Sequence, residues 1–83
     1  MSEARNFRVL YFGLLAERRG LADERVSSDA KTPAELYAEL DAAHGLGLRT
    51  ENFRPAVNDE FAAWEKAIVS GDVVAFLPPM SGG

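Results

Sequence analysis

Eighty-three residues, 47% of them hydrophobic and 27% charged, provide for one folded domain with a single core and leave no room for a second core. The absence of cysteine excludes disulfides, thiolate nucleophiles and cysteine-ligated metal sites. A net charge of −4 makes nucleic acid a poor partner, and no apolar run approaches the roughly 20 residues that a membrane-spanning helix needs.

The first third of the chain predicts two strands and a short helical turn. Residues 7–14 are rich in aromatic and branched side chains, with apolar residues on both faces, which is typical of a strand in the middle of a sheet. Residues 15–20 then form a charged, helix-compatible turn that ends at Gly20. Residues 24–28 predict a second, shorter strand, which would pair with the first as an antiparallel hairpin.

The apolar run of residues 9–16 also imitates a secretory signal, because arginines stand just before it. Glu17, Arg18 and Arg19 occupy the place where the small residues of a cleavage site should be. We therefore interpret the run as part of a buried strand, and we expect the protein to be cytoplasmic.

The start of a helix is the clearest local signal. Thr32 is a typical N-cap, Pro33 suits the first helical position, and Glu35 completes a capping box. Apolar residues then recur at helical spacing, with an aromatic residue beside them: Leu36, Tyr37, Leu40 and Ala43. The pattern stops at Gly45, and we expect this apolar stripe to lie against one face of the sheet.

The remainder of the chain predicts two further strands. Residues 56–58 form a short strand that leads into a turn. Phe61 and Trp64 have the spacing of one face of a helical turn, which favours burial of both. Residues 73–77 are an almost unbroken apolar strand, central and buried, which the prolines after it bring to an end.

These patterns predict the order strand, strand, helix, strand, strand, which indicates an α+β domain. The first and last strands are the most apolar of the four, so we expect them to be neighbours at the centre of the sheet. The pattern of the residues does not decide whether these two strands run parallel or antiparallel.

The last six residues carry the candidate chemistry. They contain no pattern able to fold and, fully extended, they reach about 20 Å at roughly 3.3 Å per residue. Prolines stiffen their start, and Gly82 and Gly83 make an end slender enough for a narrow channel in another protein. The α-carboxylate of Gly83 is not reactive by itself and would first have to become a mixed anhydride, which requires ATP and another enzyme.

Three stretches together resemble the small-subunit family of molybdopterin synthase, and the resemblance covers essentially the whole chain. The stretches are Val-Leu-Tyr-Phe at residues 9–12, Ala-Val-Asn at residues 56–58, and Gly-Asp-Val-Val-Ala-Phe-Leu-Pro-Pro-Met-Ser-Gly-Gly at residues 71–83.

The fold that this resemblance implies is the ubiquitin-like β-grasp, a mixed sheet covered by one main helix, with the first and last strands parallel. One sulfur-carrier domain would then occupy residues 1–83. Its folded body would be residues 7–77, and its flexible reactive tail residues 78–83.

The function that the resemblance implies is a sulfur-transfer cycle at Gly83. A ubiquitin-activating-like adenylyltransferase would convert the carboxylate to its AMP ester with ATP, and a sulfur donor would convert that to a thiocarboxylate. The large subunit of the synthase, in an expected heterotetramer, would use this sulfur to turn cyclic pyranopterin monophosphate into the dithiolene of molybdopterin. The chain would be a non-catalytic, sulfur-donating subunit with no bound cofactor, and the catalytic groups would lie on the large subunit.

Residues around the root of the tail are the candidates for contact with partners. They are Phe76, Leu77, Pro78, Pro79, Met80 and Ser81. Because alternate residues of a central strand point to opposite faces, Phe76 has an alternative place in the core. His44 is the only histidine, and its place near the end of the predicted helix is explained by the helix dipole, so no metal site is expected.

Other functions share the same end group. A sulfur carrier for another pathway, such as thiamin thiazole formation, would also end in Gly-Gly, although the Phe-Leu-Pro-Pro stretch argues against it. A ubiquitin-like modifier would join Gly83 to lysines of target proteins. A third alternative is an interaction domain in which the tail has no chemical role.

Overall fold

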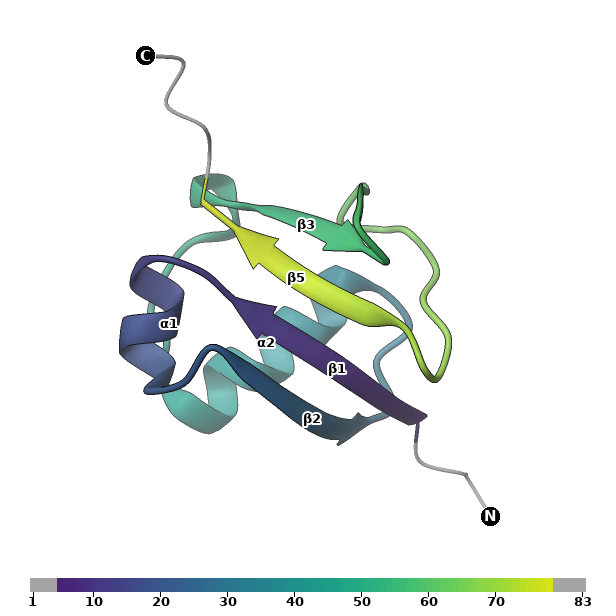
Figure 1. Cartoon of the computed structure of the whole chain (residues 1–83), viewed down its shortest axis with the longest axis horizontal. Helices are drawn as coiled ribbons and strands as arrows, with labels where there is room; N and C mark the ends of the chain where they lie inside the picture. Colours follow the sequence, from purple (N-terminus) through teal and green to yellow (C-terminus); the bar gives the residue numbers. More distant parts are fainter. Residues whose placement is uncertain (1–4, 79–83) are drawn as a thin grey trace.

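The computed structural model describes residues 5–78, which form one mixed sheet and two α-helices (Figure 1). The elements in chain order are β1 (Arg5–Tyr11), α1 (Leu14–Arg19), β2 (Asp23–Ser28), α2 (Pro33–His44), the 3-10 helix η1 (Thr50–Asn52), β3 (Arg54–Val57), β4 (Glu60–Phe61) and β5 (Val73–Leu77). The strands lie in the order β2-β1-β5-β3-β4. In Figure 1, α2 lies behind the sheet, and α1 lies where β1 ends.

The two most apolar strands are neighbours, as predicted, and β5 is the central strand. β1 and β5 run parallel, with Val9 opposite Val74 and Tyr11 opposite Phe76. All other pairs in the sheet are antiparallel. A mixed sheet covered on one face by one main helix is the β-grasp arrangement, so the fold class implied by the resemblance is confirmed.

The ends of α2 follow the sequence signals closely. The Thr32 hydroxyl accepts a hydrogen bond from the Glu35 backbone N–H at 3.2 Å, and Gly45 adopts the left-handed conformation after the last turn, with φ 63°. The Glu35 carboxylate accepts from the N–H of Lys31, one residue before the position that a standard capping box uses. Ala43 is exposed, contrary to the prediction, because the turn at Gly45 returns the chain and Leu46 fills the core instead.

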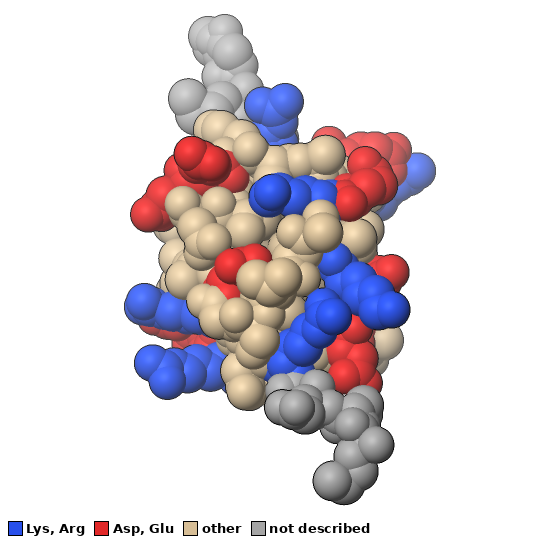
Figure 2. All heavy atoms as spheres, turned by 90° about the vertical axis from the view of Figure 1, so that its right-hand side faces the viewer, with Lys and Arg blue, Asp and Glu red and all other residues tan. Residues whose placement is uncertain are grey.

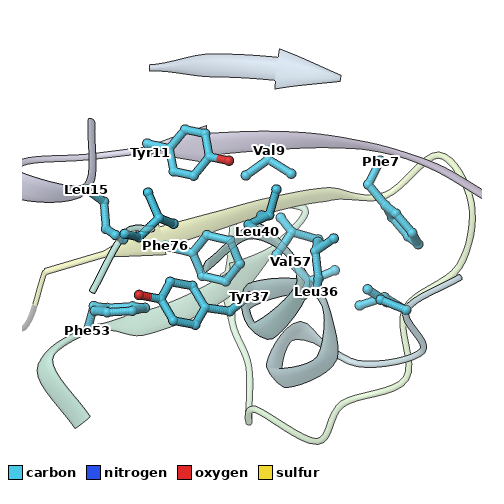
Figure 3. Packing of buried hydrophobic residues seen from close by; sticks show 14 residues of the cluster. Phe7, Val9, Tyr11, Leu15, Leu36, Tyr37, Leu40, Phe53, Val57 and Phe76 are labelled. Carbon is cyan, nitrogen blue, oxygen red and sulfur yellow. The ribbon is translucent and has the colours of Figure 1, made fainter. Parts of the chain in front are cut away.

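The core lies between the sheet and α2 and is dominated by aromatic rings (Figure 3). Tyr37 of α2 packs edge-on against Phe53 and Phe76, with ring centroids 4.8 and 5.6 Å apart. Trp64 stacks on Phe76 at 6.0 Å, so its predicted packing against the core is confirmed. Pairs of this geometry add to the stability that their buried area provides, which fixes α2 against β5.

The burial predicted for Phe61 is wrong. Phe61 belongs to β4, a two-residue strand that the sequence analysis missed, and its side chain is 65% exposed. The pairing of Phe61 with Ala56 turns the ring to the face of the sheet opposite α2, whereas Trp64 turns toward the core.

No helix between residues 5 and 78 is long and apolar enough to cross a membrane; the longest, α2, has 12 residues.

Candidate site at the exit of the tail

The carboxyl end of β5 is the place where the predicted site residues meet the surface. Leu77 is half-buried and Pro78 is exposed. Phe76 is fully buried, so the structure places it in the core and not on the partner surface, because alternate residues of β5 face opposite sides of the sheet. The other candidates lie outside the described residues: Pro79, Met80, Ser81, Gly82 and Gly83.

A hollow of about 230 Å³ opens beside Pro78, and we call it the exit hollow. Its lining is almost entirely apolar and comes from the start of α1, the segment after α2 and the root of the tail: Phe12, Leu14, Leu15, Leu48, Asn52, Phe53 and Pro78. Leu15 and Phe53 form its buried floor, with 3% and 4% exposure. Phe12 and Leu14 stand at its rim, with 42% and 48% exposure.

The backbone conformation of Gly13 shapes the rim of the hollow. The sequence analysis extended the first strand to residue 14, but β1 ends at Tyr11, because Gly13 has φ 58° and ψ −132°, a conformation that only glycine adopts readily. This turn leads directly into α1 and leaves Phe12 and Leu14 exposed on either side of it. A Cβ on Gly13 would lie 3.7 Å from Cγ of Pro78, so the turn packs beside the root of the tail.

A partly buried polar cluster holds α1 in this position. Arg19 donates two hydrogen bonds to the Glu24 carboxylate, at 2.9 and 2.7 Å, and the Tyr11 hydroxyl donates a third. The bonds from Arg19 keep the pKa of Glu24 below its ordinary value, and burial raises the pKa of Tyr11. Arg18 of α1 also donates to the carbonyl of Leu46 at 2.8 Å. These contacts make the rim of the exit hollow part of the rigid body.

The face of the sheet opposite α2 carries a second apolar surface that reaches the same region. We call this side of the sheet the open face. The register places four apolar residues side by side across it, and we call them the apolar row: Leu10, Ala75, Ala56 and Phe61. Leu77 lies on the same face, two positions after Ala75 along β5, and so joins the apolar row to the exit of the tail.

The sequence analysis missed most of this surface. Phe12, Leu14 and Leu10 were assigned to a strand buried on both faces, and Phe61 was assigned to the core. Polar residues alternate with apolar ones at the start of β1, since Asn6 and Arg8 are exposed while Phe7 and Val9 are buried. That alternation is the signal of a sheet covered on one face only, and it could have identified the open face.

Charges on the edge of the molecule are mixed. Figure 2 shows the side opposite α1, where acidic and basic side chains are interspersed among uncharged ones. On the open face, the Arg54 guanidinium lies 5.6 Å from the centroid of the Phe61 ring, a cation–π contact at the end of the apolar row.

Comparison with known proteins places the chain in a family. The model of the ThiS family matches residues 9–83. The molybdopterin synthase sulfur carrier subunit of Escherichia coli (strain K12) is 30% identical over 79 residues, which covers 92% of this chain and 98% of that protein.

Solved structures of similar chains include two kinds of protein. One chain in a protein–protein complex of subunits 1 and 2 of the molybdopterin-converting factor from Helicobacter pylori 26695 is 26% identical, with a TM-score of 0.64 and coverage of 94% of this chain and 99% of that one. The H. volcanii small archaeal modifier protein 1 is 27% identical, with a TM-score of 0.78 and coverage of 92% and 99%.

Proposed function

Because the chain belongs to the ThiS family, we propose that it works as the sulfur-carrying small subunit of a molybdopterin synthase. The relationship to the Escherichia coli sulfur carrier subunit extends over nearly the whole chain, which confirms the resemblance found in the sequence. The main structural support for the proposal is the position at which the folded body ends. The central strand finishes at Leu77, Pro78 is exposed, and five residues then lead to the carboxylate of Gly83.

The proposed chemistry takes place at Gly83. Its carboxylate attacks the α-phosphorus of ATP on an activating enzyme, which forms the acyl-adenylate and releases pyrophosphate. A sulfur donor then displaces AMP and leaves a thiocarboxylate. The large subunit transfers the sulfur to cyclic pyranopterin monophosphate, water supplies the oxygen that restores the carboxylate, and two such cycles complete a dithiolene.

The proposed partner is a large synthase subunit, and the Helicobacter pylori complex of two subunits supports it. Five extended residues beyond Pro78 span about 17 Å, so a partner that takes Gly83 into a pocket must come close to the surface around Pro78. The exposed apolar groups there are the rim of the exit hollow and the end of the apolar row. We assign both to the docking surface, because exposed apolar area of this kind is stabilised by burial in a partner.

Deletion of Gly83 tests the function. We expect the shortened chain to lose sulfur transfer completely, because the carboxylate of Gly82 would end about 3.5 Å short of the reacting position. The thermal midpoint of unfolding should stay unchanged, since residues between 7 and 76 build the described core cluster. The measurement is dithiolene formation by the reconstituted synthase, with circular dichroism as the control for folding. Transfer at the normal rate by the shortened chain contradicts the proposal.

Covalent protein modification is the second candidate, and the similarity to the H. volcanii small archaeal modifier protein 1 favours it. The same acyl-adenylate would lead to an isopeptide bond between Gly83 and a lysine of a target protein. This function is recognised by conjugates of higher mass that disappear when Gly83 is deleted. Both functions can belong to one chain, because they diverge only after activation.

A further inference from the structure

The open face has a charge opposite to that of the whole chain. Arg8 and Arg25 lie opposite each other in β1 and β2, on one side of the apolar row. Arg54 lies opposite Leu77, on the other side of the row and next to the exit of the tail. The apolar row is therefore bordered by arginines along both of its long sides.

Acidic strand residues neutralise only one of these three arginines. Within the part of the chain that the structure describes, Asp23 is the only acidic strand residue that points to the open face, and it forms an ion pair with Arg8. Glu24 points to Tyr11 on the other side of the sheet. Among residues 5–78, Arg25 and Arg54 have no ion-pair partner. Three arginines against one aspartate give this face a charge of +2, in a chain whose net charge is −4.

The helix that covers the opposite face of the sheet is acidic. α2 covers the other face of the sheet and contains Glu35, Glu39 and Asp41, with no lysine or arginine. The charge of α2 is therefore opposite in sign to that of the open face. A charge distribution of this kind orients a protein as it approaches a charged surface and raises the association rate.

We propose that the large subunit docks on the open face through an apolar patch bordered by carboxylates, which approach Arg25 and Arg54. This inference rests on the proposed function and adds the chemistry of the partner surface. Apolar residues in the centre with charges at the border match the usual anatomy of a protein interface. No ion pair within residues 5–78 has to break before a partner carboxylate can approach either arginine.

Association kinetics test the inference with the full chain and the large synthase subunit of the same organism. The variants Arg25→Glu and Arg54→Glu reverse charges on the open face. Lys31→Glu, just before α2, and Lys66→Glu, between β4 and β5, are the matched controls, because both lysines are exposed and lie off the open face. Each of the four substitutions changes the net charge by the same amount.

At low salt, we expect each arginine reversal to slow association about tenfold and each control to change it less than about twofold. The difference should shrink above about 0.5 M salt, where the screening length falls to a few ångströms. Equal effects of arginine and lysine reversals, or faster association after arginine reversal, overturn the inference. So does concentration-dependent self-association that the arginine reversals abolish, because the acidic α2 side of a second copy would then be the occupant.

Different results would contradict the inference about carboxylates and the proposed function. If the wild-type chain binds the large subunit and delivers sulfur, but without dependence on salt or on the arginines, only the inference about carboxylates is wrong. If the wild-type chain neither binds the large subunit nor delivers sulfur, the proposed function itself is wrong, and the inference falls with it.

Discussion

Glu24 shows how one residue links the body of the protein to its site. Its carboxylate accepts hydrogen bonds from Arg19 of α1 and Tyr11 of β1, and its side chain is only 15% exposed. Loss of this acceptor would leave a guanidinium and a hydroxyl group without their shared partner. The position of α1, and with it the rim of the exit hollow, therefore depends on the charge of Glu24.

The substitution Glu24→Gln should lower the free energy of unfolding by about 2 kcal/mol at pH 7, because it weakens bonds to a shielded charge. The folded protein holds the pKa of Glu24 below its ordinary value of 4.5. The stabilisation is therefore complete above pH 4.5 and is lost as the pH falls through the lower, folded-state pKa.

Thermal unfolding of both proteins from pH 7 to pH 3 measures this effect. The wild-type midpoint should approach that of the variant at the acidic end. A constant difference in midpoint across the whole range would show that the Glu24 charge is not the source of the stabilisation.

Single residues also mark what the sequence could and could not predict. Thr32, Pro33 and Gly45 act through bonds and conformations within a few residues, so their roles at the ends of α2 were readable from the sequence. Phe76 and Phe61 were not, because the face that a strand residue takes depends on register with a neighbouring strand. The first is in the core and the second is on the open face.

Among the elements, β4 is very short but has a large effect on the open face. It consists of two residues, and only its pairing with β3 makes it a strand, so no local pattern in the sequence could have predicted it. The same pairing extends the apolar row to Phe61. The end of β1 was also missed, because the apolar run continues through Phe12 and Leu14 while the turn depends on the backbone conformation of Gly13.

Replacement of Phe61 by serine tests the role of this element in docking. We expect the dissociation constant for the large subunit to rise about tenfold, because an exposed aromatic ring that is buried on binding is a typical energetic anchor of an interface. Val69→Ser is the matched control, since Val69 is also apolar and 61% exposed but lies before β5, away from the tail.

Isothermal titration calorimetry with the large subunit measures both variants. Thermal midpoints should be close to that of the wild type, because both side chains are exposed in the folded state. Equal binding by Phe61→Ser and wild type would remove the apolar row from the docking surface.

At the scale of the whole molecule, the α+β class and the central position of the first and last strands followed from the residues alone. The parallel pairing of β1 and β5 did not, because an apolar strand suits either direction, and it came from the resemblance. The end of the last strand at Leu77 was readable from the apolar run and the prolines after it. The surface around this end was not, since strands far apart in sequence assemble it.

In the proposed function, a rigid β-grasp body presents the carboxyl group of Gly83 to an activating enzyme and then to a large subunit. The apolar row and the exit hollow lie on the body beside the last described residue, and the chemistry is assigned to the end of the chain. A body of this kind needs no catalytic group of its own, because its task is to position an end group.

The mass of the intact protein after incubation with ATP, its activating enzyme and a sulfur donor tests this claim most directly. We predict a gain of about 16 Da, from exchange of one carboxylate oxygen for sulfur, with no gain in a chain that lacks Gly83. An unchanged mass, under conditions in which the same enzymes load a known carrier, would contradict the central claim.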